Sequence, residues 1–303
     1  MAAVRGVGLS SAVSDDIHFD RLRENLDQAE EFGVEFVELP LFAMDLIAGG
    51  RVIESQMRRL HDALKARSLG YTAHGPIGIN FMQAPEIVAR HLAVARATIE
   101  VAAEIGVVHL VLHAGCTSAQ DEAEIEALYA TQREAFATVG DFAAKHGIWI
   151  AVENIYVNWR HEHTPLPGRL AQEIEAIAHP NVKGCIDFSH AALACAAKGA
   201  NFLDEAKALA RVANHLHIHD SFGDPATIWT FSRSERLAFG LGDLHLPIGW
   251  GNIPWRQIMA EFEFLPDAIF NLELPVQYWF ALEESFRAVQ DMAEVYRARS
   301  AAA

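Results

Sequence analysis

The chain has 303 residues and a formal charge of −16, from 24 Lys and Arg against 40 Asp and Glu. This charge disfavours attraction to nucleic acid and to anionic membranes. No apolar run reaches the ~20 residues that a membrane helix needs, and the N-terminal segment lacks the apolar core of a signal peptide. Because the three cysteines follow no zinc-binding or disulfide spacing, we expect a reduced, cytoplasmic protein.

Short apolar runs alternate with longer segments of helical periodicity along the chain. We predict strands over residues 4–9, 34–40, 70–74, 107–113, 147–153, 182–187, 213–219 and 268–273. Helices are predicted between them, over residues 17–32, 53–68, 86–105, 119–145, 168–178, 190–199, 254–264 and 277–298. Eight strands alternating with helices predict an α/β fold, a (β/α)8 TIM barrel, as a single domain over residues 1–303.

Two connections between predicted elements exceed the usual loop length. One covers residues 157–169, after the fifth strand, and the other covers about residues 221–252, after the seventh. Both leave the C-terminal face, where barrel active sites lie, and loops of this length are often functional. We therefore expect the second connection, which contains Trp229, Arg233 and Arg236, to form a lid over the substrate.

Metal-ligand side chains stand at the C-terminal ends of the predicted strands or in loops on the same face. They are His74, His113, Glu153, Asp187, His190, His217, Asp243, His245 and Glu273. Each alone has a structural explanation, but side chains at these positions converge on one face of a barrel. One metal ion rarely takes more than four protein ligands. The set therefore predicts two or three divalent ions, zinc, manganese or iron, that share carboxylates.

Three histidines follow one another at alternate positions of the seventh predicted strand. His215, His217 and His219 are spaced by two, so they share one face of that strand. His217 is the expected metal ligand, and His215 would lie deeper in a structural role. His219 would lie nearer the mouth, where it faces the substrate or supports the ligands.

The segments that carry these residues resemble the xylose isomerase-like TIM barrel superfamily from about residue 34 to 298, with a metal site most similar to that of endonuclease IV. The segments are HGPIGIN, LHAG, VEN, IDFSH, HIHD, DLHLPIGWGN and LELP. The resemblance implies three metal-binding sets, with Glu153 bridging. The sets are His74, His113 and Glu153; Asp187, His217 and Glu273; and His190, Asp243 and His245. Ile77 replaces the tyrosine with which the DNA-repair enzymes enter the duplex, which argues against DNA repair.

Our first hypothesis is a metal-dependent hydrolase, a phosphoesterase or phosphodiesterase acting on a small anionic molecule. A water between two ions would be the nucleophile, because metal coordination lowers its pKa toward neutrality. Glu153 would assist its deprotonation, and the ion held by His190 would stabilise the leaving oxygen. The residues expected to contact the substrate are Arg160, Trp229, Arg233 and Arg236.

The sugar isomerase and epimerase branch of the superfamily provides the alternative. The resemblance then implies a single divalent ion on Glu153, Asp187, His217 and Glu273. Glu153 and Glu273 would also move protons on either side of a ketose carbonyl. His190 would hold the substrate, and Glu38, in VELP at the end of the second predicted strand, would be a further substrate contact.

Overall fold

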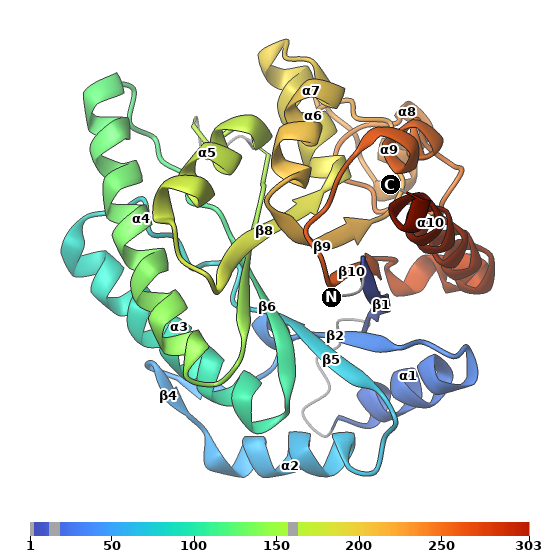
Figure 1. Cartoon of the computed structure of the whole chain (residues 1–303), viewed down its shortest axis with the longest axis horizontal. Helices are drawn as coiled ribbons and strands as arrows, with labels where there is room; N and C mark the ends of the chain where they lie inside the picture. The colour runs from blue at the N-terminus through green and yellow to red at the C-terminus, as the bar shows by residue number, and fades with distance from the viewer. Residues whose placement is uncertain (1–2, 12–18, 157–162, 303) are drawn as a thin grey trace.

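The structure is a computed structural model that describes residues 3–11, 19–156 and 163–302. Within these residues, eight parallel strands close into a barrel (Figure 1). They are β1 Val4–Ser10, β2 Phe36–Pro40, β5 Gly70–His74, β6 Val107–His113, β7 Trp149–Glu153, β8 Val182–Asp187, β9 Ala213–Ile218 and β10 Ala268–Leu272. Each barrel strand pairs with the next in the chain, and β10 pairs with β1. The predicted (β/α)8 barrel is therefore confirmed.

Helices surround the barrel and bury the outer face of its strands (Figure 1). They are α1 Asp20–Glu31, η1 Leu41–Ala43, α2 Glu54–Leu64, α3 Pro85–Glu104, α4 Glu122–Ala144, α5 Pro167–Ile177, α6 Phe188–Lys198, α7 Phe202–Ala210, α8 Arg233–Phe239, α9 Trp255–Glu261, η2 Val276–Ala281 and α10 Leu282–Ala302. A short antiparallel hairpin, β3 Ile47–Ala48 and β4 Arg51–Val52, lies between β2 and α2. None of the helices in the described segments is long and apolar enough to cross a membrane.

Two helices were not predicted from the sequence. Helix α7 has an evident start signal, because the side chain of Asn201 accepts hydrogen bonds from the backbone N–H groups of Leu203 and Asp204. Helix α8 is a short helix within the long connection after β9, and Ser232 caps it by accepting from the backbone of Glu235. The connection predicted as a lid is thus partly helical.

The start of α6 brings two of the predicted ligands together. The helix begins at Phe188, two residues before the predicted start, because Asp187 is its N-cap. Asp187 Oδ1 accepts a hydrogen bond from the backbone N–H of His190 at 2.7 Å. This cap holds the end of β8 and the first turn of α6 at one corner of the barrel mouth.

A small apolar cluster lies inside the barrel beneath part of its polar mouth. Val111, Ala151 and Cys185 form a small buried cluster of their own inside the barrel. Because strand side chains alternate between the two faces, the residues two positions further along point inward one layer closer to the C-terminal mouth. Those residues are His113, Glu153 and Asp187. Strand geometry therefore places three predicted ligands in one layer at the mouth.

Candidate metal centre

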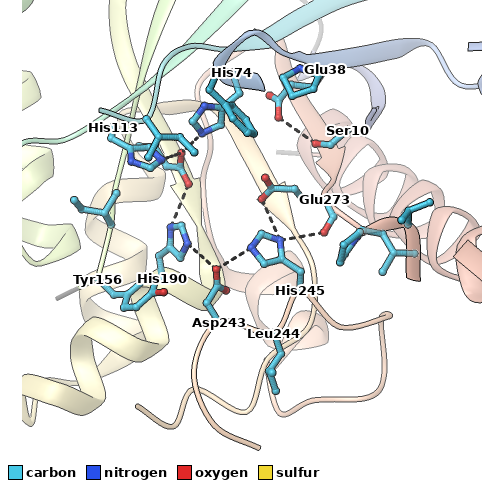
Figure 2. A pocket seen from close by; sticks show the side chains of 18 of the residues that line it. Ser10, Glu38, His74, His113, Tyr156, His190, Asp243, Leu244, His245 and Glu273 are labelled. Carbon is cyan, nitrogen blue, oxygen red and sulfur yellow. Dashed lines mark hydrogen bonds and ion pairs between the residues drawn. The ribbon is translucent and has the colours of Figure 1, made fainter. Parts of the chain in front are cut away.

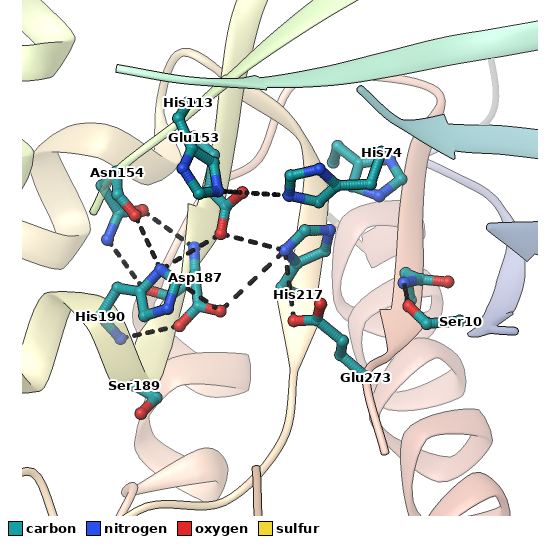
Figure 3. A network of polar contacts seen from close by, with 12 residues as sticks. Ser10, His74, His113, Glu153, Asn154, Asp187, Ser189, His190, His217 and Glu273 are labelled. Carbon is teal, nitrogen blue, oxygen red and sulfur yellow. Dashed lines mark hydrogen bonds and ion pairs between the residues drawn. The ribbon is translucent and has the colours of Figure 1, made fainter. Parts of the chain in front are cut away.

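His217 on β9 is the centre around which the carboxylates of the mouth gather (Figure 3). Measured from His217 Nδ1, the nearest carboxylate oxygens are Glu153 Oε1 at 3.2 Å, Glu273 Oε2 at 3.5 Å and Asp187 Oδ2 at 4.0 Å. We call Glu153, Asp187, His217 and Glu273 the strand group, because they stand at the ends of β7 to β10. His217 and Asp187 are fully buried, and Glu153 is 1 % exposed.

Glu153 also joins the histidines of β5 and β6. Its Oε2 lies 3.1 Å from His74 Nε2 and 3.3 Å from His113 Nε2, while its Oε1 lies 3.2 Å from His190 Nδ1. Burial alone raises the pKa of Glu153, but the neighbouring histidines, His217 foremost, bring that pKa well below its usual value. Glu153 is therefore ionised and shared among several donors, the arrangement expected of a bridging metal ligand.

A second set of ligand side chains lies on the other side of the mouth (Figure 2). Asp243 Oδ2 lies 2.8 Å from His245 Nε2 and 3.3 Å from His190 Nε2. We call His190, Asp243 and His245 the loop group, since two of the three belong to the connection after β9. Burial lowers the pKa of His245, but Asp243 and then Glu273 raise it to about 10. Attraction to Asp243 thus favours the charged imidazole when no metal competes.

The loop that carries Asp243 and His245 is held by Asp220, a residue that sequence reasoning missed. The backbone of Asp220 exchanges two hydrogen bonds with Leu246, at 2.8 and 2.9 Å. Its carboxylate accepts from the backbone N–H of Gly249 at 2.7 Å. Gly251 packs so closely that an added Cβ would lie 2.3 Å from Ser221 O. The HIHD and GWGN segments are therefore packed and hydrogen-bonded together. Asp220, which directly follows His219 in the sequence, was the signal that could have predicted this contact.

Two more residues beside the predicted ligands were missed. Asn154 follows Glu153 directly and exchanges two hydrogen bonds with the backbone of Asp187, both at 2.9 Å. The ring of Tyr156 lies 5.1 Å from that of His190 and lines the cavity. Asn154 ties β7 to β8 where both strands deliver a ligand, which the VEN segment could have indicated.

His219 lies beneath the mouth and contacts both groups. It is fully buried, and its Nε2 lies 2.9 Å from Asp187 Oδ2 and 3.8 Å from Glu273 Oε2. Its ring stacks on that of His245, with centroids 3.9 Å apart and planes 8° apart. His219 therefore packs between the strand group and the loop group, below the surface of the cavity.

A cavity of about 710 Å³ opens above these groups (Figure 2). Its floor includes Glu38, His74, Glu153 and Glu273, and its wall includes Phe42, Ile77, Tyr156, Arg233, Arg236 and Val276. Arg233 stacks over the ring of Tyr278, 4.5 Å from its centroid. Of the other predicted substrate contacts, Trp229 is 83 % exposed and is not among the residues that line the cavity, while Arg160 lies outside the described residues.

The donor chemistry of the mouth suits a divalent metal ion. Ligand atoms within 4.8 Å of one another occur in several sets of the described residues, among them His74 with His113 and Glu153, and the loop group. Imidazole nitrogens with carboxylate oxygens fit zinc, manganese or iron. The side chains at the mouth therefore fit the predicted divalent metal.

The comparisons with known proteins place the chain in a family. The sequence matches the family described as Xylose isomerase-like TIM barrel over residues 26–298. The chain therefore belongs to this family, as the predicted resemblance implied. No curated protein matches the chain in sequence.

Solved structures share the fold at low sequence identity. A D-tagatose 3-epimerase-like protein is 18 % identical with a TM-score of 0.69, over 97 % of this chain and 99 % of its own. The D-allulose 3-epimerase from Methylomonas sp., in complex with D-allulose, is 16 % identical with a TM-score of 0.64, over 99 % of each chain. The IOLI protein with a binding zinc atom is 14 % identical with a TM-score of 0.64, over 96 % of this chain and 98 % of its own.

These comparisons correct the first functional hypothesis. The prediction of a metal-dependent hydrolase, whether phosphoesterase or phosphodiesterase, is wrong, because several of the similar structures are named as sugar epimerases or epimerase-like proteins and none of those reported is named as a hydrolase. The error has a physical origin. Histidine and carboxylate ligands at a barrel mouth serve hydrolysis and proton transfer alike, so the ligand set alone does not identify the reaction.

Proposed function

We propose that this member of the xylose isomerase-like TIM barrel family is a divalent-metal-dependent sugar isomerase or epimerase. The observation that carries the proposal is the strand group. Three carboxylates from β7, β8 and β10 surround one nitrogen of His217 at 3.2 to 4.0 Å. The named activities of structures with the same fold support the same reading.

The strand group would hold the primary ion. Its three carboxylate ligands and one imidazole would make a site of four protein ligands, and an ion that takes six ligands, such as manganese, would keep two positions for substrate oxygens. A divalent ion bound there would polarise the oxygens of a sugar and stabilise negative charge that develops on them. We propose that the loop group holds a second ion, as His190 Nε2 and His245 Nε2 each lie within 3.3 Å of Asp243 Oδ2.

Glu153 and Glu273 would move the protons. One carboxylate takes the proton from the carbon beside a ketose carbonyl, and the C–H electron pair passes into an enediolate of the substrate. The other carboxylate returns a proton from the opposite face, which inverts that carbon. His217 Nδ1 contacts both glutamates. Removal of a proton from C1 of a ketose, and its return to the former carbonyl carbon C2, would give an aldose instead.

The cavity would bind a small, anionic sugar. His190 lies at the cavity wall, where its ring nitrogens contact Glu153 and Asp243 and where an ion held by the loop group would face a substrate hydroxyl. Arg233 and Arg236 supply positive charge to the cavity wall. A guanidinium binds a carboxylate or phosphate through paired N–H groups. The polar floor thus suits the hydroxyl groups of a sugar, and the arginines suit an acidic group at its far end.

A substrate panel tests the proposal. Metal-free protein reconstituted with manganese, cobalt or zinc is incubated with neutral ketoses, ketose phosphates and keto sugar acids, and the sugars are separated by chromatography. We expect conversion of at least one ketose to an epimer or aldose, and loss of that conversion after chelation. Protein that is loaded with metal and converts no sugar of any class would overturn the proposal.

A further inference from the structure

Glu38 is a buried carboxylate at the mouth that the proposed proton transfer does not use. It stands on β2, is 2 % exposed, and is in contact with four donors. The donors are Ser10 Oγ at 3.1 Å, Asn271 Nδ2 at 3.3 Å, His215 Nε2 at 3.0 Å and His217 Nε2 at 3.2 Å. Glu38 is thus fixed from three other strands, and one of its partners is the histidine at the centre of the strand group.

The two nitrogens of His217 face different surroundings. Nδ1 faces the three carboxylates of the strand group, whereas Nε2 faces Glu38. A neutral imidazole carries a proton on one nitrogen and a free lone pair on the other. A carboxylate that accepts the Nε2 proton therefore leaves the Nδ1 lone pair directed at the strand group.

We propose that Glu38 is a positioning residue, which fixes the tautomer and ring orientation of His217 so that Nδ1 binds the divalent ion. The inference rests on the proposed metal site at the strand group. Metal-binding histidines generally donate their other N–H to a carboxylate or carbonyl, and this contact raises their affinity for the ion. This role differs from the substrate contact that the sequence predicted for Glu38.

A direct metal-binding role for Glu38 is the main competitor. Ligand atoms of Glu38, His217 and Glu273 do lie within 4.8 Å of one another. A carboxylate offers about four lone-pair positions, and four donors already occupy those of Glu38. Only this carboxylate lies within 4 Å of His217 Nε2 among the described residues, whereas three lie at Nδ1. The geometry therefore favours the ion at Nδ1.

A second histidine prevents Glu38 from turning away. His215 Nε2 bonds Glu38 Oε2, and His215 Nδ1 lies 3.3 Å from Nδ1 of His109 deeper in the barrel. His215 is fully buried, and His109 is 1 % exposed. Because packed neighbours hold this chain, Glu38 presents its carboxylate to His217 in one orientation.

The test is the metal affinity of the Glu38→Gln variant, which keeps the shape of the side chain. Zinc is titrated into metal-free protein against a chromophoric chelator, so the readout does not depend on turnover. We expect affinity at the primary site to fall about 10–100-fold, as for loss of other outer partners of metal ligands, with unchanged stoichiometry at saturation. The matched control is Thr72→Val. Thr72 pairs with Glu38 in register, is fully buried and its hydroxyl has no hydrogen-bond partner among the described residues, so affinity should not change.

Three outcomes would overturn the inference. Unchanged affinity in Glu38→Gln means that His217 needs no positioning, and loss of one ion at saturation means that Glu38 is itself a ligand. A raised KM for sugar with unchanged metal affinity means that Glu38 contacts substrate. If Glu38→Gln fails to fold, Ser10→Ala removes one donor to Glu38 and should weaken zinc binding severalfold. Wild-type protein that binds none of zinc, manganese and cobalt would instead defeat the proposed function.

Discussion

The strand group and the loop group are built from the same kinds of side chain but are held differently. The strand group stands at the ends of four neighbouring barrel strands, and three of its members are at most 1 % exposed. The loop-group side chains are 11 to 25 % exposed, and His245 has a left-handed backbone with φ of 47°. Barrel strands fix the first group, whereas a connection supported by Asp220 fixes the second. We therefore propose that the strand group performs the chemistry and that the loop group has an adjustable, supporting role.

The strongest test of this assignment is the Glu153→Gln variant. An amide does not take up the proton that the carboxylate accepts, so turnover of a sugar substrate should fall about 10²–10⁴-fold. Steady-state rates at saturating metal measure the effect. Glu173→Gln is the control, because Glu173 is also a buried carboxylate but pairs with Arg133 and Arg169 away from the mouth. Its variant should lose stability and keep turnover. Equal rates for Glu153→Gln and wild type would contradict the assignment.

Removing one histidine from each group compares the groups directly. His217→Ala should weaken the primary ion by more than the ~10–100-fold that an outer partner contributes, and turnover should disappear with it. His245→Ala should lose only the second ion, with a rate lower by roughly tenfold, or ~1.4 kcal/mol. Elemental analysis and rates for both variants measure this contrast. If His245→Ala is the more damaging change, the roles of the two groups are reversed.

Disturbing the loop without changing a ligand separates its conformation from its chemistry. Gly251→Ala places a Cβ 2.3 Å from the backbone oxygen of Ser221, which should cost about 1–3 kcal/mol of stability. The displaced loop should weaken the second ion and leave the primary ion in place. Gly78→Ala is the control, because in the part of the chain that the structure describes no atom beyond its chain neighbours lies within 4 Å of its added Cβ. Thermal melting and metal content report the two effects, and loss of both ions would deny the independence of the groups.

The smallest expected effect concerns Arg233, which lines the wall of the cavity. Arg233→Gln should raise KM about tenfold for a sugar that carries a phosphate or carboxylate, because a charge-assisted hydrogen bond is lost. KM for a neutral ketose should not change. Arg287→Gln is the control, since Arg287 is exposed on α10 and pairs with Glu283. A similar rise of KM for both sugars would show that Arg233 does not recognise charge.

The barrel could be predicted from the sequence because its signals are local. Alternating apolar runs identified each barrel strand, and parity along β9 placed His215, His217 and His219 on one face. The positions of glycine and proline did not predict α8, which lies inside a long connection. The end positions of strands therefore carried most of the information about the mouth.

The contacts within the site could not be predicted from local sequence patterns. Glu38 and His217 are 179 positions apart in the chain, and only barrel closure brings β2 and β9 close enough for their side chains to meet. The loop group likewise depends on Asp220, which pairs with Leu246 across the connection. The sequence also led to the wrong prediction of the reaction, hydrolysis. The types of the metal-ligand residues limit which metal ion can bind more than they limit which substrate reacts.

The central claim is that the strand group supports proton transfer on a sugar. The most direct measurement is NMR of ketoses in D2O with metal-reconstituted protein. We predict that the hydrogen beside the carbonyl exchanges for deuterium as an epimer or aldose forms, and that Glu153→Gln and Glu273→Gln each abolish this exchange. Protein that retains its metal yet exchanges no carbon-bound hydrogen on neutral, phosphorylated or acidic ketoses would contradict the claim.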